Sequence, residues 1–350
     1  MSHAKGHQLM RINLLATIVA GILQGGDSRI SQIAQSINEG RRKHDSVKKQ
    51  VSRFVKNDHI SHDEHYLPFV NNLLEVLSQT GELVFAIDGS KVGSGCMALM
   101  FSVIYKNRAI PIIWHVYRRK KGHFAEQVHI DLLNDLKALV PQGCRVCIVG
   151  DGEFDGCDWQ AGIVASGWDY VLRTARNTLL ENNYGDQYQP CGVLTDQGED
   201  YFEEGLIMGK NRYGPVNLYI THGYGHELPL ILITNLDYGQ IIKQFYIKRF
   251  LIETFFRDSK SKGFNLQKSG LRCPKKIARL MIANCIAYVL CILAGIKSYK
   301  SKFYDLVAEA DQKALSLFQI GLRFIRKLVD LRQWRAFSWS YDLALSINQS

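Results

Sequence analysis

The spacing of apolar residues changes twice along the chain and predicts three regions. Over residues 14–22, apolar residues recur three or four positions apart, as on one face of a helix, and Gly25 and Gly26 end the stripe. Short apolar runs bounded by polar turns begin at residue 83, and residues 275–335 return to helical, largely apolar sequence. The pattern predicts a helical region, an α/β core and a second helical region.

The middle region predicts a mixed sheet with helices on its faces. The expected order is strand, strand, strand, helix, strand, helix, strand, over residues 83–87, 97–105, 109–117, 124–139, 145–150, 158–166 and 168–172. This order is typical of an RNase H-like core. Residues 176–228, rich in Gly, Asn and Tyr, predict a small β insertion, and residues 228–234 return as a core strand. The expected fold class is α/β: an RNase H-like mixed-sheet core interrupted by a small β insertion.

Positive charge favours a polyanionic partner. The 350 residues carry a formal net charge of +10, which indicates nucleic acid before an anionic membrane surface. In the N-terminal region, two short helical stretches precede a helix that reaches residue 56 and carries Lys48, Lys49 and Arg53. A turn followed by a basic helix is typical of a helix-turn-helix DNA reader. The alternative is a small helical bundle with a basic face.

Cysteine and hydropathy patterns indicate a reducing compartment and no membrane partner. The eight cysteines are scattered, and the pair Cys144 and Cys147 has no second pair to complete a zinc site. The apolar run over residues 280–296 is marginal for a membrane span, and we interpret it as a buried helix. We therefore expect a cytoplasmic protein.

One predicted helix, over residues 245–260, carries an unusual polar face. Tyr246, Arg249, Glu253 and Lys260 are spaced 3, 4 and 7 apart, so they fall on one side of the helix, and Arg257 joins them. A lone carboxylate among a phenol and three cations suits a site that holds a metal ion and grips phosphates beside it. The alternative is a row of solvated ion pairs.

Two aspartates are expected to meet Glu253. Asp88 follows the first core strand and Asp151 follows the fourth, and these strands should lie side by side. Three carboxylates that close repel one another unless a divalent cation is present, and oxygen ligands suit Mg²⁺ or Mn²⁺. Two such ions can activate a nucleophile and stabilise the leaving oxygen in phosphodiester chemistry.

A second basic group follows the third predicted strand. Arg118, Arg119, Lys120 and Lys121 lie between that strand and the next helix, near the Asp88 edge of the sheet by connectivity. A phosphate-gripping loop and a solvated charge run are both open interpretations.

These motifs resemble bacterial insertion-sequence transposases of the DDE class, most closely the insertion-sequence-four family, whose mark is Tyr-x2-Arg-x3-Glu-x6-Lys. The resemblance covers about residues 83–295 and includes the stretches around Asp88 and Asp151 and the sequence Gly-Phe-Asn-Leu over residues 263–266. The second-aspartate motif of the family often reads Asp-x-Gly-Phe or Asp-x-Gly-Tyr. Here Gly152 precedes Glu153, so Glu153 is a rival to Asp151 as the second carboxylate.

The resemblance implies an enzyme that moves DNA. Asp88, Asp151 and Glu253 would bind two Mg²⁺ or Mn²⁺ ions and catalyse phosphodiester hydrolysis and strand transfer. The partners would be double-stranded DNA at the terminal inverted repeats and at the target, and a second copy of the chain in a synaptic homodimer. The alternatives are a catalytically inactive DNA-binding descendant of a transposase and an RNase H-like metal-dependent nuclease.

The resemblance implies a bacterial, nucleoid-associated protein, and five parts are expected along the chain. They are a helical DNA-binding region (1–75), the first part of the core (80–175), the β-rich insertion (176–228), the second part of the core with the 245–260 helix (229–270), and a C-terminal helical region (271–350).

Overall fold

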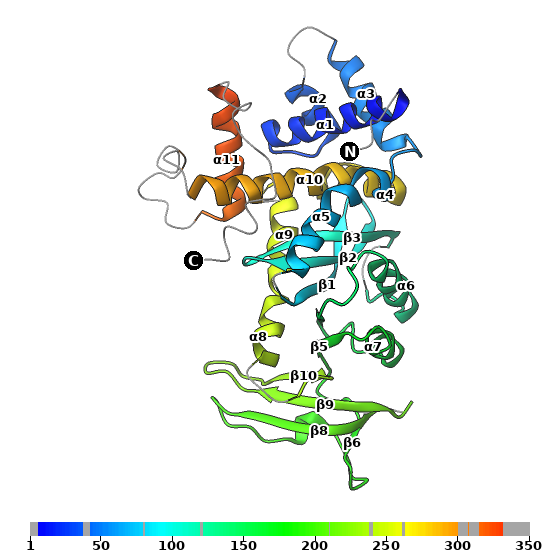
Figure 1. The fold of residues 1–350 in the computed structure, drawn as a ribbon, viewed down its shortest axis with the longest axis vertical. Helices are drawn as coiled ribbons and strands as arrows, with labels where there is room; N and C mark the ends of the chain where they lie inside the picture. The colour runs from blue at the N-terminus through cyan, green and yellow to red at the C-terminus, as the bar shows by residue number, and fades with distance from the viewer. Residues whose placement is uncertain are drawn as a thin grey trace.

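The computed structural model describes residues 6–37, 43–79, 81–119, 122–209, 211–237, 241–260, 263–299, 307 and 315–331. Helices gather at one end of the molecule and a long sheet extends to the other (Figure 1). The sheet has ten strands in the order β3-β2-β1-β4-β5-β10-β9-β8-β6-β7. Its parallel and antiparallel pairs confirm the prediction of a mixed sheet in an α/β protein.

The N-terminal region is helical, as its apolar spacing predicts. Its elements are α1 (His7–Gly25), α2 (Ile30–Ser36), α3 (His44–Lys56), α4 (His62–His65) and α5 (Leu67–Ser78). Helix α1 ends where Gly26 adopts a left-handed conformation and donates its N–H to the Ile22 carbonyl. Helices α1, α2 and α3 pack together, and α1 and α3 contact α10 (Pro274–Tyr299), at the end of the molecule opposite the insertion strands (Figure 1).

The first part of the core follows the predicted order. It contains β1 (Leu83–Val92), β2 (Cys96–Tyr105), β3 (Arg108–Arg118), α6 (Glu126–Lys137), β4 (Val146–Gly150), α7 (Cys157–Val164) and β5 (Asp169–Arg173). Strand β1 pairs antiparallel with β2 and parallel with β4, which pairs parallel with β5. Lys106 and Asn107, both at positive φ, form the tight turn of the β2–β3 hairpin.

The predicted insertion extends the core sheet. Its strands are β6 (Leu180–Glu181), β7 (Gln187–Tyr188), β8 (Asp200–Met208) and β9 (Tyr213–Thr221), with a 3₁₀ turn η1 (Pro190–Gly192). Strand β10 (Leu230–Thr234) pairs antiparallel with β5 on one side and with β9 on the other. Strand β10 pairs with the otherwise free edge of β5. Strands β9 and β8 then continue the same sheet beyond β10.

The helix predicted over residues 245–260 is broken in two. Helix α8 (Ile241–Lys248) ends before Arg249, and α9 (Leu251–Ser259) begins after Phe250. At the break the Arg249 and Phe250 N–H groups donate to the carbonyls three residues back, so the chain is wound more tightly there. The expectation of one continuous helical face is wrong, and Lys260 lies just beyond the end of α9.

The C-terminal helices close the fold. They are α10 (Pro274–Tyr299) and α11 (Leu317–Asp330), and a 3₁₀ turn η2 (Leu266–Lys268) precedes α10. By length and composition, α1 and the Pro274–Ser298 part of α10 could each cross a membrane, but 83% of the apolar window of α10 is buried inside the fold. This agrees with the interpretation of residues 280–296 as a core helix.

Close contact between α10 and α11 depends on Gly321. A methyl group added there would lie 1.7 Å from the Cys291 carbonyl oxygen, which is backbone and cannot rotate away. We expect Gly321→Ala to lower the free energy of unfolding by about 3 kcal/mol, the upper part of the usual overpacking range. Gly192→Ala is the control because nothing lies within 4 Å of its added methyl. Chemical denaturation compares the two variants, and equal stability would contradict this packing.

Candidate functional site

Asp88 and Asp151 lie on neighbouring parallel strands. The β1–β4 pairing runs from Leu83 opposite Val146 to Ala86 opposite Val149. Asp151 comes directly after β4, whereas Asp88 lies within β1, which the sequence predicted to end there. Strand β1 continues because Asp88 and the residues after it still pair with β2. The two carboxylates therefore lie close to the point where the β1–β4 pairing ends.

Burial and mutual repulsion govern the charge of Asp88. Desolvation is the main cause that raises its pKa to about 7, and the Asp151 carboxylate raises it further. Arg249 and the N–H of Gly89, which donates to Asp88 Oδ1 at 2.6 Å, oppose this rise, and Glu253 adds to it. The Asp151 and Glu253 carboxylates thus both act electrostatically on Asp88.

Arg249 lies between the carboxylates. Its guanidinium is 3.8 Å from Asp88 Oδ2 and 3.1 Å from Glu253 Oε1, and only 8% of the residue is exposed. The ring of Phe250 lies 4.3 Å from the guanidinium carbon. Tyr246 is also buried, and burial raises the pKa of its phenol. The break between α8 and α9 therefore places a cation inside the site.

Lys260 joins the site from the other end of α9. Its ammonium group donates to the hydroxyl of Ser90, two residues after Asp88 on β1. Burial lowers the pKa of Lys260, and the Asp88 carboxylate opposes this. Alternate residues of a strand share a face, so the spacing of Asp88 and Ser90 carried a signal for this contact that the sequence analysis missed.

Arg257 faces a different partner. Its Nε lies 3.9 Å from Asp258 Oδ1, and half of its side chain is exposed. Among the described ion pairs, none joins Arg257 to Asp88, Asp151 or Glu253. Arg257 lies one turn beyond Glu253 on α9, and its role in gripping a phosphate stays a prediction.

The rival carboxylate Glu153 is held by its own neighbours. Its Oε1 accepts the Phe124 N–H at 2.5 Å, and His123 and His129 lie 3.2 and 3.6 Å from its carboxylate oxygens. Burial would raise the pKa of Glu153, but the neighbouring His129 ring and the Phe124 N–H lower it. These contacts favour Asp151 as the second site carboxylate. Its Oδ1 accepts the Glu153 N–H at 3.0 Å.

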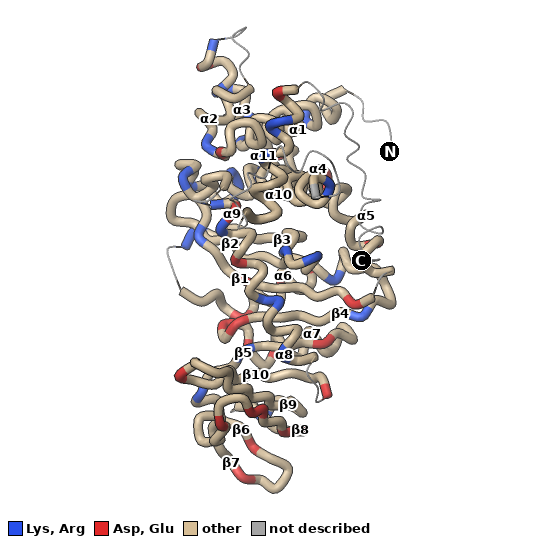
Figure 2. Tube along the Cα trace, turned by 90° about the vertical axis from the view of Figure 1, so that its left-hand side faces the viewer, with Lys and Arg blue, Asp and Glu red and all other residues tan. Residues whose placement is uncertain are grey.

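The other predicted basic residues form two separate groups. Arg118 is exposed at the end of β3, Arg119 packs its guanidinium 5.2 Å from the Phe124 ring centre, and Lys120 and Lys121 lie outside the described residues. Lys48, Lys49 and Arg53 are exposed on α3, opposite its buried residues Val47, Val51, Phe54 and Val55. Figure 2 shows Lys and Arg around α2, α3, α9 and α10, and acidic positions towards β5 and β8.

The donor set suits a hard divalent cation. Asp88, Asp151 and Glu253 offer only oxygen atoms, and the charges of Asp151 and Glu253 add to the rise that burial causes in the pKa of Asp88. Within the described part of the chain, no three His, Cys, Asp or Glu side chains come close enough to enclose an ion. The residues fit a cation by chemistry, while Glu253 pairs with Arg249 in this structure.

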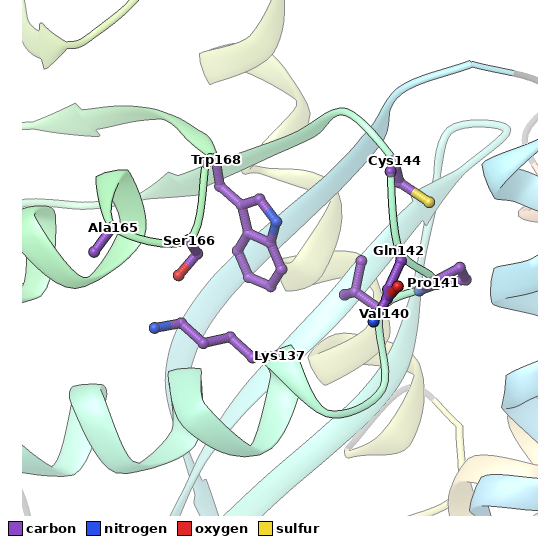
Figure 3. A pocket seen from close by; sticks show the side chains of 10 residues that line it. Lys137, Val140, Pro141, Gln142, Cys144, Ala165, Ser166 and Trp168 are labelled. Carbon is purple, nitrogen blue, oxygen red and sulfur yellow. The ribbon is translucent and has the colours of Figure 1, made fainter.

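One cavity lies away from these carboxylates. It measures about 500 Å³ and is lined by residues 140–144 and 165–168 together with Lys137. The indole of Trp168 points into it, between Lys137 and Cys144 (Figure 3). These residues precede β4 and β5, so the cavity lies at the amino ends of the strands, and none of its lining residues is acidic. It is not the carboxylate site.

Comparisons with known proteins agree with this geometry. Residues 79–290 match the family described as the transposase DDE domain. A cryo-EM structure of a piggyBac transposase synaptic complex with hairpin DNA is similar over 99% of this chain and 77% of that chain, with a TM-score of 0.48 and 10% identity. A crystal structure of Aa-Ago with externally bound siRNA covers 61% and 31%, with a TM-score of 0.26 and 15% identity. No curated protein matches. The family match spans more than half of the 350 residues, and the chain belongs to the transposase DDE domain family.

Proposed function

We propose that the chain is an insertion-sequence transposase that cuts DNA at the ends of its element and joins the freed 3′-hydroxyls to target DNA. The observation that carries this is that Arg249 contacts both Asp88 and Glu253 while the Asp151 carboxylate acts on Asp88 from the end of the neighbouring strand, in a chain of the transposase DDE family. The Tyr-x2-Arg-x3-Glu-x6-Lys spacing supports placement in the insertion-sequence-four family.

Asp88, Asp151 and Glu253 would hold two Mg²⁺ or Mn²⁺ ions. When bound, such ions activate a water or a 3′-hydroxyl and stabilise the leaving oxygen. Arg249 orients Glu253 through its 3.1 Å contact and limits the repulsion between Glu253 and Asp88. Lys260, held beside the site by Ser90, supplies positive charge for a DNA phosphate.

The remaining assignments complete the proposal. Residues 1–75 would bind the terminal inverted repeats, residues 80–175 and 229–270 would form the catalytic core, residues 176–228 the insertion, and residues 271–350 a C-terminal region that contacts a second copy. The active form would be a homodimer in a synaptic complex on the bacterial nucleoid. Arg118, Arg119, Lys120 and Lys121 would grip phosphates near the Asp88 edge.

The test is cleavage of a duplex that carries the inverted repeat flanking the coding region. We expect cuts at the repeat ends with Mg²⁺ or Mn²⁺ and none with a chelator. A protein that binds the ends and never cuts would be the inactive DNA-binding descendant. Cuts at random positions with no preference for the repeat would indicate a general metal-dependent nuclease.

The basic face of α3 yields a prediction for end binding. Lys48, Lys49 and Arg53 are exposed, and each phosphate contact contributes about 0.9 to the slope of log affinity against log salt concentration. Replacing all three by alanine should therefore reduce that slope by up to about 2.7. The control replaces three cations remote from α3, Lys137, Arg145 and Arg212. Equal slopes for the two triple variants, measured by fluorescence anisotropy over a salt series, would refute DNA binding by α3.

A further inference from the structure

A buried polar contact joins the α1–α2 linker to the turn that follows α9. The Asn265 side-chain amide donates to Asp27 Oδ2 at 3.0 Å, and the Ser28 N–H donates to the Phe264 carbonyl at 2.6 Å. Asp27 is 5% exposed and Ser28 is fully buried. Residues about 240 positions apart in sequence are thus tied together where Asp27 and Ser28 are buried.

The turn is rigidly connected to the candidate active site. Asn265 adopts a left-handed conformation with φ 53°, and its N–H donates to the Lys260 carbonyl at 2.7 Å. Phe264 donates its N–H to the Asp258 carbonyl at 2.9 Å. Lys260 in turn contacts Ser90 beside Asp88. Two backbone hydrogen bonds thus tie Phe264 and Asn265 to the end of α9, next to Lys260.

The linker is equally well connected to the helices of the proposed DNA reader. Asp27 Oδ1 accepts the Arg29 backbone N–H at 2.7 Å, and α2 begins at the next residue, Ile30. The Arg29 guanidinium also pairs with Asp27, at 2.7 Å from Oδ2. Asn284 of α10 donates to the Ser28 hydroxyl at 2.8 Å, so a third segment fixes the linker.

Such a contact specifies one relative position of the two parts. Apolar surfaces can slide by a few ångströms at little cost, but buried polar groups are satisfied only in the arrangement that pairs them. Neighbouring phosphates of one DNA strand are about 3.4 Å apart along the helix axis. A slip of that size between α3 and Asp88 would bring the wrong phosphate to the site.

We propose that Asp27 and Asn265 are positioning residues that fix α2 and α3 relative to the carboxylates and so set which phosphate is cut. This inference rests on the proposed function, because it needs a chain that both reads a terminal sequence and cuts near it. Neither residue touches the three carboxylates, and their effect passes through the turn at residues 264–265 and the linker at residues 26–29.

The test maps cut positions at nucleotide resolution on the inverted-repeat duplex with Mg²⁺. Asn265→Gly removes the side chain and keeps the left-handed backbone that glycine adopts freely. The control is Asn235→Ala, which removes another amide that bridges segments: its Oδ1 accepts the Tyr170 N–H at 2.9 Å, away from the linker. Both variants lose hydrogen bonds between distant segments, so an effect that comes from lost stability alone should appear in both variants.

The expected result is a shift in position. Wild type and Asn235→Ala should cut at one phosphate on each strand, whereas Asn265→Gly should spread its cuts to adjacent phosphates while still binding the repeat. If Asn265→Gly cuts at the wild-type phosphate alone, the contact only stabilises the fold and the inference is overturned. If the wild type does not cut at all, the proposed function fails and this inference fails with it.

Discussion

Glu253→Gln is expected to abolish DNA cleavage while leaving DNA binding intact. Glutamine keeps the shape of the side chain and removes the charge that would hold a cation, and metal stabilisation of the reacting oxygens is worth several kcal/mol. The rate of end cleavage should fall about 10³-fold or more. Gel-based cleavage kinetics with Mg²⁺, together with anisotropy binding to the same duplex, measure the two effects separately.

The matched control for this variant is Glu75→Gln. Glu75 is also an exposed glutamate on a helix, α5, and none of the described ion pairs involves it. It should cleave at the wild-type rate. Cleavage by Glu253→Gln within about threefold of wild type would remove Glu253 from the catalytic set.

Asp88→Asn is expected to stabilise the metal-free protein and to inactivate it. The pKa of Asp88 is raised to about 7, above its ordinary value, so the folded state binds the proton more tightly than the unfolded state. The free energy of unfolding therefore falls as pH rises from about 4 to about 7, because above this range the folded state must hold the Asp88 carboxylate buried and charged. Asparagine removes this cost, which we place at roughly 1–3 kcal/mol above pH 7.

Thermal unfolding with and without Mn²⁺ tests this prediction. Above about pH 7 without metal, Asp88→Asn should melt higher than wild type, and the difference should shrink near pH 5. Metal at about 100 times its dissociation constant should stabilise the wild type by about 2.7 kcal/mol and the variant much less. A variant that melts lower than wild type under all these conditions would show that the Asp88 charge stabilises the fold.

Local features of the sequence predicted the main parts of the site. Apolar runs that end near Asp88 and Asp151 identified two core strands, and the RNase H-like order of strands and helices predicted that they lie side by side, as the parallel β1–β4 pairing shows. Their proximity therefore followed from topology. The exposed cations of α3 followed in the same way from the helical spacing of Val47, Val51 and Phe54.

Features that depend on long-range contacts were not predictable. The helical spacing over residues 245–260 continues through the break at Arg249, so the sequence gives no sign of the break. The tighter winding there accompanies the buried contacts of the Arg249 guanidinium with Asp88 and Phe250. The addition of β8 and β9 to the core sheet depends on the free edge of β5, far away in sequence. The contact between Asp27 and Asn265 likewise has no local signal.

Strand transfer tests the central claim most directly, because it separates a transposase from a nuclease on the same core. Wild-type protein, a pre-cut duplex with a free 3′-hydroxyl at the repeat end, Mg²⁺ and a supercoiled target plasmid would be incubated together. The proposed function predicts that the repeat end becomes covalently joined to the plasmid, with Glu253→Gln inactive. Cleavage of uncut ends by the wild type without any joining of the pre-cut end would contradict it.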